Sequence, residues 1–126
     1  MTSFDIIYMA NIMIADDSDA IRLVLNDILS IGKHTIVCEA SNGEEAVELF
    51  FKVSPDLLLL DLAMPKKDGL TVVKEIMEKN PQAKIILITA SDDQKIINQC
   101  LQLGASSCIS KPFDINNVLK QITDSL

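Results

Sequence analysis

The amino-acid sequence predicts an α/β fold: a parallel sheet, doubly wound, with helices on both faces. Short apolar segments alternate five times with segments of helical periodicity. The connections between them are short, and strands that alternate with helices pair in parallel through right-handed crossovers. The 126 residues suit a single domain, and 48% hydrophobic residues supply a core without disulfides or a structural metal.

The first strand follows an apolar leader. Residues 1–10 are expected to be a leader or an extension of the first strand, ahead of a domain that spans residues 11–126. Docking on a partner, or a true start near Met9, are alternatives that the sequence leaves open. Residues 11–15 form an apolar run that stops at two aspartates, which is typical of a buried strand.

The first helix is predicted to begin after Ser18, a suitable N-cap, and to end at Gly32. Helical spacing predicts its buried face, which consists of Ile21, Val24, Leu25, Ile28 and Leu29. Residues 35–40 are rich in β-branched side chains and are predicted to form the second strand.

A second helix is predicted where Asn42 and Glu45 resemble a capping box, and Pro55 ends it. Its buried side is predicted to be Ala46, Val47, Leu49 and Phe50. The leucines at 57–60 then run into Asp61. A continuous apolar run of this kind indicates a central strand that is covered on both faces.

The third helix is predicted over 69–79, and a strand follows at 84–89. The apolar stripe of this helix is Leu70, Val73, Ile76 and Met77. Asp92 or Asp93 is expected to cap a fourth helix that ends near Gly104. The apolar residues of that helix are Ile96, Ile97, Cys100 and Leu101.

The last strand is predicted at 108–110, and Asp114 is expected to cap the closing helix. The apolar face of this helix is Ile115, Val118, Leu119 and Ile122. With this helix the pattern holds five strands and five helices.

Charge and cysteine content exclude several classes of function. The 18 acidic and 11 basic residues give a net charge of −7, which repels nucleic-acid backbones and anionic lipid. We therefore expect no direct binding to nucleic acid. No apolar run reaches the length of a membrane span, so we expect no membrane insertion. Three cysteines without CxxC spacing argue against disulfides or zinc and favour a reducing, cytoplasmic location.

Polar side chains gather where the predicted strands end. Because the carboxyl ends of parallel strands meet at one edge of the sheet, ligands of such folds bind there. The residues in question are Asp16, Asp17, Asp61, Thr89 and Lys111. Each has an ordinary structural explanation when taken alone, such as helix capping or surface solvation. Together they indicate a site.

Converging carboxylates repel one another, and a bound cation relieves the repulsion. Mg²⁺ suits a site built from Asp alone, because it takes oxygen ligands and keeps places for water and phosphate oxygens. An aspartate beside such a cation can attack phosphorus and form an acyl phosphate. Lys111 would add positive charge and Thr89 a hydroxyl donor for the phosphoryl oxygens.

These residues resemble the receiver domains of two-component response regulators, particularly the stand-alone CheY-like type. The resemblance runs from about Asn11 to Ile122. Its motifs are Asp16-Asp17, Asp61 with Met64-Pro65 and Asp68-Gly69, Thr89-Ala90, and Lys111-Pro112-Phe113. It implies a flavodoxin-like sheet of order 2-1-3-4-5, which the residue pattern alone does not specify.

The resemblance also implies roles for individual residues. Asp61 would be the phosphoacceptor, and the metal would be bound by Asp17, Asp61 and the backbone carbonyl of Ala63, with Asp16 acting through water. Lys111 would contact the phosphoryl group, and Thr89 would move toward it on phosphorylation. The bond between Lys111 and Pro112 would be cis, and Gly69 would permit the tight entry into the third helix.

Two features depart from or modify the family pattern. Cys108 occupies the fifth-strand position where many receivers carry Tyr or Phe, which puts the usual aromatic readout in doubt. We expect switching through shifts of a loop and the fourth helix instead. Ala63 and Ser91 are both small at positions that tune access of water to the acyl phosphate. We therefore expect a short-lived phosphoryl group.

The resulting hypothesis is a single-domain signalling protein that is phosphorylated by a histidine kinase and catalyses only its own phosphorylation and dephosphorylation. A downstream protein would bind the face of the fourth helix, fifth strand and fifth helix. The polar residues of this face are Asp92, Gln94, Lys95, Asn98, Gln99, Gln102, Asn116 and Asn117. We expect a monomer or a weak dimer. Chemotaxis output, phosphorelay intermediate and phosphate sink remain open.

Two other functions compete with this one. A Mg²⁺-dependent phosphohydrolase would also use an aspartyl nucleophile, but Ala63, two residues beyond Asp61, cannot act as its general acid. A degenerate receiver would bind partners without phosphorylation, although all the required side chains are present.

Overall fold

The computed structural model describes residues 9–90 and 93–126. Five parallel strands form one sheet in the spatial order β2-β1-β3-β4-β5. The predicted fold class and the strand order implied by the resemblance are both confirmed. The elements are β1 (Asn11–Ala15), α1 (Asp19–Ile31), β2 (Thr35–Ala40), α2 (Gly43–Val53), β3 (Leu57–Asp61), α3 (Gly69–Lys79), β4 (Ile85–Thr89), α4 (Gln94–Gln102), β5 (Ser107–Ser110) and α5 (Ile115–Ser125).

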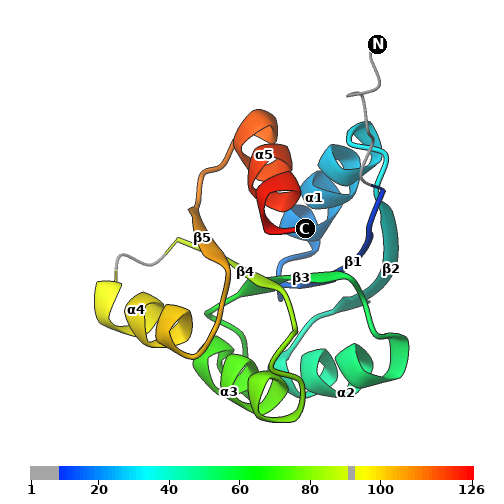
Figure 1. The fold of residues 1–126 in the computed structure, drawn as a ribbon. Helices are drawn as coiled ribbons and strands as arrows, with labels where there is room; N and C mark the ends of the chain where they lie inside the picture. Colours follow the sequence, from blue (N-terminus) through cyan, green and yellow to red (C-terminus); the bar gives the residue numbers. More distant parts are fainter. Residues whose placement is uncertain (1–8, 91–92) are drawn as a thin grey trace.

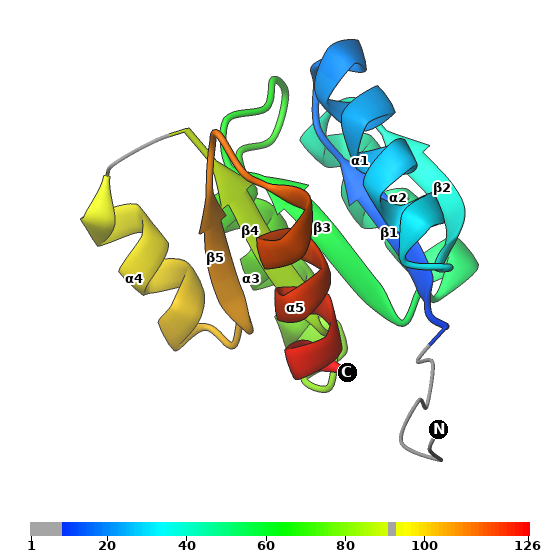
Figure 2. The ribbon, with the colours of Figure 1, turned by 90° about the horizontal axis from the view of Figure 1, so that it is seen from above.

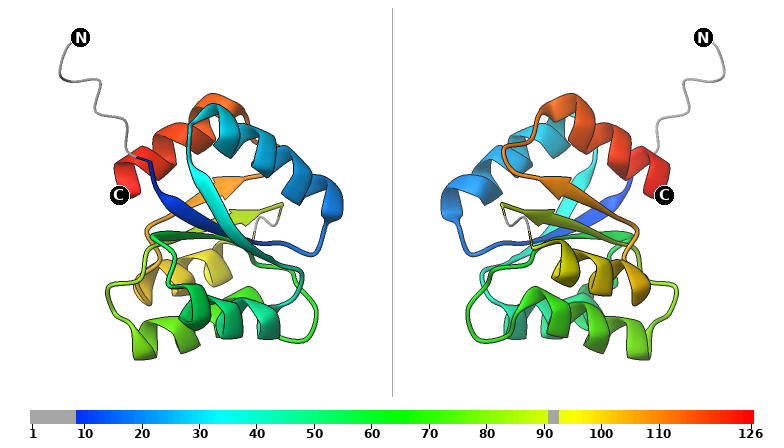
Figure 3. Two further views of the ribbon diagram at one scale, coloured as in Figure 1. Left: turned by 90° about the vertical axis from the view of Figure 1, so that its right-hand side faces the viewer. Right: turned by 90° about the vertical axis from the view of Figure 1, so that its left-hand side faces the viewer.

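Helices cover both faces of the sheet. α1 and α5 lie on one face, and α2, α3 and α4 lie on the other (Figures 1 and 3). The view from above shows α5 lying along the sheet next to β5 and over β4, while α1 lies over β1 (Figure 2). Within residues 9–90 and 93–126, the helices are all too short or too polar to cross a membrane.

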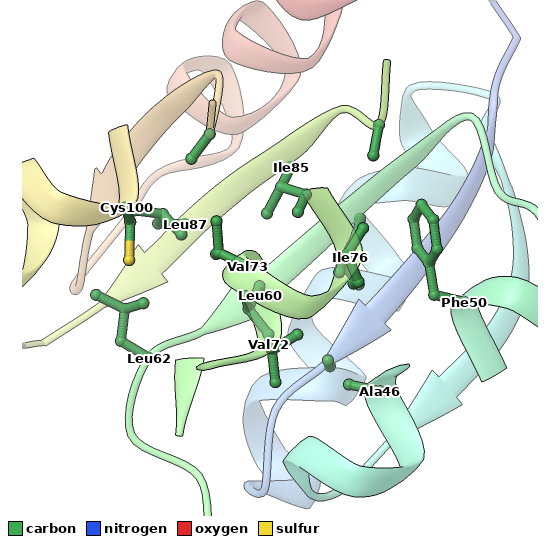
Figure 4. Packing of buried hydrophobic residues seen from close by; sticks show 14 of the residues in the cluster. Ala46, Phe50, Leu60, Leu62, Val72, Val73, Ile76, Ile85, Leu87 and Cys100 are labelled. Carbon is green, nitrogen blue, oxygen red and sulfur yellow. The ribbon is translucent and has the colours of Figure 1, made fainter. Parts of the chain in front are cut away.

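The core is centred on β3 and β4, whose residues are all buried. On the α2–α3 face, Val72, Val73 and Ile76 of α3 pack among Leu60 and the neighbouring strands (Figure 4). A second cluster fills the α1–α5 face. Burying one such aliphatic side chain contributes about 1.5–3 kcal/mol, so this double-sided core holds the strand ends in fixed positions.

Each helix begins at a polar cap. The side chains of the N-cap residues accept a hydrogen bond from the backbone N–H three residues later; they are Ser18, Asn42, Asp68, Asp93 and Asp114. Asp68 was not predicted as a cap. The predicted capping box is altered, because the Glu45 carboxylate accepts from the Ser41 N–H at 2.9 Å instead of from the Asn42 N–H.

Several predicted buried faces are wrong in detail. Val24 is 46% exposed, because it lies roughly a quarter turn from the stripe that packs on the sheet. Ile96 and Leu101 are each 37% exposed, since α4 buries only Ile97 and Cys100. Val72 is buried although it was left out of the predicted stripe.

Some predicted ends shift by one residue. β4 begins at Ile85 and β5 at Ser107, and the C-cap of α4 is Leu103, with Gly104 next at a φ of +120°. Asp92 and Ser91 lie outside the described residues, as do residues 1–8 of the leader. The predicted leader boundary therefore stays a prediction.

One glycine fixes the approach of two segments. Gly43 is the first residue of α2, and its N–H donates to the Pro65 carbonyl at 3.3 Å. A Cβ on Gly43 would lie 1.8 Å from the Lys67 carbonyl oxygen. The first residue of α2 thus has to be glycine for the loop between β3 and α3 to lie against it.

We predict that Gly43→Ala lowers the free energy of unfolding by about 1–3 kcal/mol, because the backbone contact must open and this outweighs the higher helix propensity of alanine. Urea denaturation measures the change. Glu44→Ala, an exposed substitution in the same turn, is the matched control and should be nearly neutral. A Gly43→Ala protein as stable as the original would contradict the close approach.

Candidate phosphoryl-transfer site

The strand register places the predicted site residues side by side. Ala15 pairs with Leu60, so the next residues of the two strands, Asp16 and Asp61, emerge together at the carboxyl edge of the sheet. Thr89 ends β4 opposite Ser110 of β5, which is followed by Lys111. The pairing of β1 with β2 shifts register between Ile12 and Met13, and beyond the paired residues the Asp16 N–H donates to the Ala40 carbonyl at 3.0 Å.

Three of the predicted residues form an acidic cluster. Asp16, Asp17 and Asp61 each contribute a carboxylate oxygen, and these oxygens all lie within 4.8 Å of one another. Asp16 and Asp61 are buried, whereas Asp17 is exposed. The cluster thus has two fixed members at the strand ends and one that faces solvent.

Lys111 is the cation nearest to this cluster in the described part of the chain. Its Nζ atom lies 3.1 Å from Asp16 Oδ2 and 3.7 Å from Asp61 Oδ1. The lysine side chain is 18% exposed, so the pair is largely shielded from water. The bond between Lys111 and Pro112 is cis, as the resemblance implied.

The pKa of Asp61 is raised from 3.8 to about 6, chiefly because the carboxyl is buried. The charges of Asp16 and Asp17 contribute to this rise, while the Ala63 N–H and the Lys111 ammonium oppose it. The Ala63 N–H donates to Asp61 Oδ1 at 3.2 Å. The buried carboxylate is therefore held in a place where its charge is costly.

The remaining predicted residues lie around the cluster. Thr89 is 1% exposed at the end of β4, and its carbonyl accepts from the Lys111 N–H at 2.8 Å. Ala63 is exposed in the loop after β3. Gly69 begins α3 where a Cβ would lie 2.6 Å from the Leu62 Cα, so the tight entry expected here is present. Cys108 is half-buried on β5 and packs against the core cluster on the face that α2, α3 and α4 cover.

Sequence reasoning missed two contributors. Arg22 was not assigned a role, yet its Nη1 donates to the Asp16 carbonyl at 2.6 Å. The Ser18 N–H donates to Asp16 Oδ1 at 2.9 Å, in addition to the capping role that was predicted for this residue. The sequence did contain one indication of a role for Arg22: it is the first basic residue of the chain and lies one turn into the helix that follows the aspartate pair.

Comparison with known proteins decides the family. The model of the family described as "Response regulator receiver domain" matches residues 12–123. The chain belongs to this family. The chain is a CheY-like receiver, a domain of two-component signalling systems.

Similar receivers include whole proteins of matching length. The chemotaxis protein CheY of Bacillus subtilis is 40% identical over 115 residues, covering 91% of this chain and 96% of that protein. Protein CcdB of the same organism is 35% identical with the same coverage. A chain of the CheX-CheY-BeF₃-Mg²⁺ complex from Borrelia burgdorferi has a TM-score of 0.87 and 34% identity, and the match covers 90% of this receiver and 87% of that chain.

The donor set of this receiver fits a hard divalent cation. Carboxylate oxygens within 4.8 Å, without His or Cys among them, are the ligands that Mg²⁺ prefers. Burial, together with the charges of Asp16 and Asp17, raises the pKa of Asp61, so a bound cation would offset a charge that is costly here.

We predict that Asp61→Asn stabilises the metal-free protein at pH 7.5 by about 1–3 kcal/mol, because it removes a buried charge. The folded-state pKa of Asp61 lies above its unfolded value. Acidification through pH 6 toward 3.8 therefore stabilises the original protein, and the difference between the two proteins shrinks.

Urea denaturation in chelator across this pH range measures the difference. Asp27→Asn, at an exposed position of α1, is the matched control and should leave stability unchanged. A difference that stayed constant from pH 7.5 to 4 would contradict the raised pKa of Asp61.

Proposed function

We propose that this receiver accepts a phosphoryl group from a histidine kinase on Asp61, in a Mg²⁺-dependent reaction, and that the phosphorylated form changes its affinity for a protein partner. One observation carries the proposal: the Asp61 carboxylate lies at the end of a buried strand between two further carboxylates and the Lys111 ammonium. The similarity to CheY proteins over their whole length supports it.

The transfer is a displacement at phosphorus. An oxygen of Asp61 forms a bond to phosphorus while the bond from phosphorus to the kinase imidazole nitrogen breaks, and the imidazole leaves with that electron pair. The Ala63 N–H and Lys111 both contact Asp61 Oδ1, so we assign the attack to Oδ2. Lys111 then neutralises negative charge on the phosphoryl oxygens.

Asp17, Asp61 and the Ala63 carbonyl would hold Mg²⁺ directly, with Asp16 acting through water. When bound, the cation supplies positive charge that offsets the charge of the phosphoryl oxygens. Ser18 and Lys111 fix the Asp16 carboxylate through its two oxygens, at 2.9 and 3.1 Å. Thr89, buried at the end of β4, would donate its hydroxyl to a phosphoryl oxygen and shift its loop toward the site.

Signal output would use the face of α4, β5 and α5, where exposed polar residues such as Gln94, Asn98 and Asn116 lie beside the partly exposed Ile96 and Leu101. The related CheY from B. burgdorferi was solved with CheX, BeF₃ and Mg²⁺. By analogy, we propose that the phosphorylated protein binds a cytoplasmic partner protein rather than nucleic acid, as a monomer or weak dimer. The phosphohydrolase alternative is disfavoured, because exposed Ala63 occupies the position where that reaction needs an acid.

Intact mass spectrometry tests the proposal. Incubation with Mg²⁺ and acetyl phosphate, a small acyl phosphate donor, is expected to add the mass of one phosphoryl group. Asp61→Asn and a chelator should each abolish the gain, and Asp27→Asn should leave it intact. The adduct should decay unaided, and more slowly in Ala63→Lys, where a bulky side chain obstructs the attacking water. No adduct from either acetyl phosphate or a phosphorylated histidine kinase would contradict the proposal.

The small side chain of Cys108 predicts which elements change conformation on phosphorylation. Because a cysteine cannot fill the space that Thr89 vacates, we expect the change to appear in α4 and its preceding loop. Amide NMR spectra with and without BeF₃ and Mg²⁺ should show shifted signals for residues 93–103 and smaller changes in α2. Unchanged signals for residues 93–103 would contradict this prediction.

A further inference from the structure

Arg22 connects the acidic cluster to two neighbouring elements. Its side chain is 16% exposed in α1 and makes three polar contacts. Nη1 donates to the main-chain carbonyl of Asp16 at 2.6 Å, Nε contacts Glu39 Oε1 of β2 at 3.1 Å, and Nη2 contacts Asp19. Asn26 also donates to Glu39, at 3.2 Å, so the anchor on β2 is itself held.

The carbonyl that Arg22 binds belongs to the peptide joining Asp16 to Asp17. The other polar groups of Asp16 are engaged elsewhere: its N–H by Ala40, and its carboxylate by Ser18 and Lys111. A peptide group is planar, so fixing its carbonyl oxygen also fixes the direction in which the next Cα lies. The contact with Arg22 therefore sets where the backbone of Asp17 begins.

Asp17 has no comparable support of its own. It is the exposed member of the cluster, and across residues 9–90 and 93–126 no hydrogen bond holds its carboxylate. Its carboxylate oxygen nevertheless lies within 4.8 Å of the oxygens of Asp16 and Asp61. The backbone is thus the route by which the fold places this side chain.

We propose that Arg22 is a positioning residue for the cation site: by holding the Asp16 carbonyl, it orients the exposed Asp17 carboxylate toward Asp61. This inference rests on the proposed function, because it concerns the same Mg²⁺ site. Residues that orient metal ligands from outside the coordination shell commonly change metal affinity by about 10- to 100-fold.

The direction in which Mg²⁺ affinity changes when Arg22 is replaced separates a positioning role from a simple effect of its charge. Arg22 is a cation beside a cation site, so its charge alone weakens Mg²⁺ binding, and deleting that charge would tighten it. Positioning predicts the opposite, because a displaced Asp17 weakens binding. A purely structural role would change the free energy of unfolding and leave the affinity for Mg²⁺ unchanged.

Isothermal titration calorimetry with Mg²⁺ tests the proposal on the unsubstituted protein, Arg22→Ala, Arg22→Lys and Lys66→Gln. Arg22→Ala should weaken Mg²⁺ binding about tenfold. Arg22→Lys keeps the charge and a single donor group, and its affinity should fall between the two. Lys66→Gln, which removes an exposed charge from the loop between β3 and α3, is the control for loss of a positive charge and should bind equally or more tightly.

A metal-free measurement accompanies the titration. Amide ¹⁵N relaxation should show larger motion at Asp17 in Arg22→Ala. If Arg22→Ala does not fold, the same comparison is made with Arg22→Lys. Unchanged or tighter Mg²⁺ binding by Arg22→Ala, beside normal binding by the original protein, would overturn this inference alone. Failure of the original protein to bind Mg²⁺ would overturn the proposed function and this inference with it.

Discussion

Electrostatic repulsion among three carboxylates, held within 4.8 Å at one edge of the sheet, is the constraint on which the remaining features depend. Flexible side chains would relieve it by moving apart. Here β1 and β3 are buried and in register, so Asp16 and Asp61 cannot separate. The core therefore supplies the free energy that keeps like charges together, and burial together with the neighbouring carboxylates raises the pKa of Asp61.

The same arrangement connects the site to the end of β5. Lys111 contacts both buried aspartates and follows β5 directly, while Thr89 ends β4. Under the proposed function, a change of charge at Asp61 would act on Lys111 and so on the end of β5. α3 buries four residues, whereas α4 buries only Ile97 and Cys100. With α5, which also buries only two residues, α4 is therefore among the helices that can move with the smallest loss of packing.

Most of the fold and the main site residues were predictable from the sequence because they depend on local patterns. Apolar runs ending in aspartate identified β1 and β3, and strand ends identified Asp61, Thr89 and Lys111. Contacts between distant segments were not predictable in this way. Arg22 acts through a backbone carbonyl, and Gly43 matters because a loop from beyond β3 lies against it. The exposure of Val24 depends on how α1 is rotated on the sheet, which periodicity fixes only approximately.

The most direct test of this account is whether a divalent cation replaces a proton in the carboxylate cluster. Calorimetric titration with Mg²⁺, at pH 6 and pH 8 in buffers of different ionisation enthalpy, measures the protons released on binding. With a pKa of about 6 for Asp61, Mg²⁺ should release roughly half a proton at pH 6 and almost none at pH 8. Binding without proton release at pH 6, or no binding at either pH, would contradict the account.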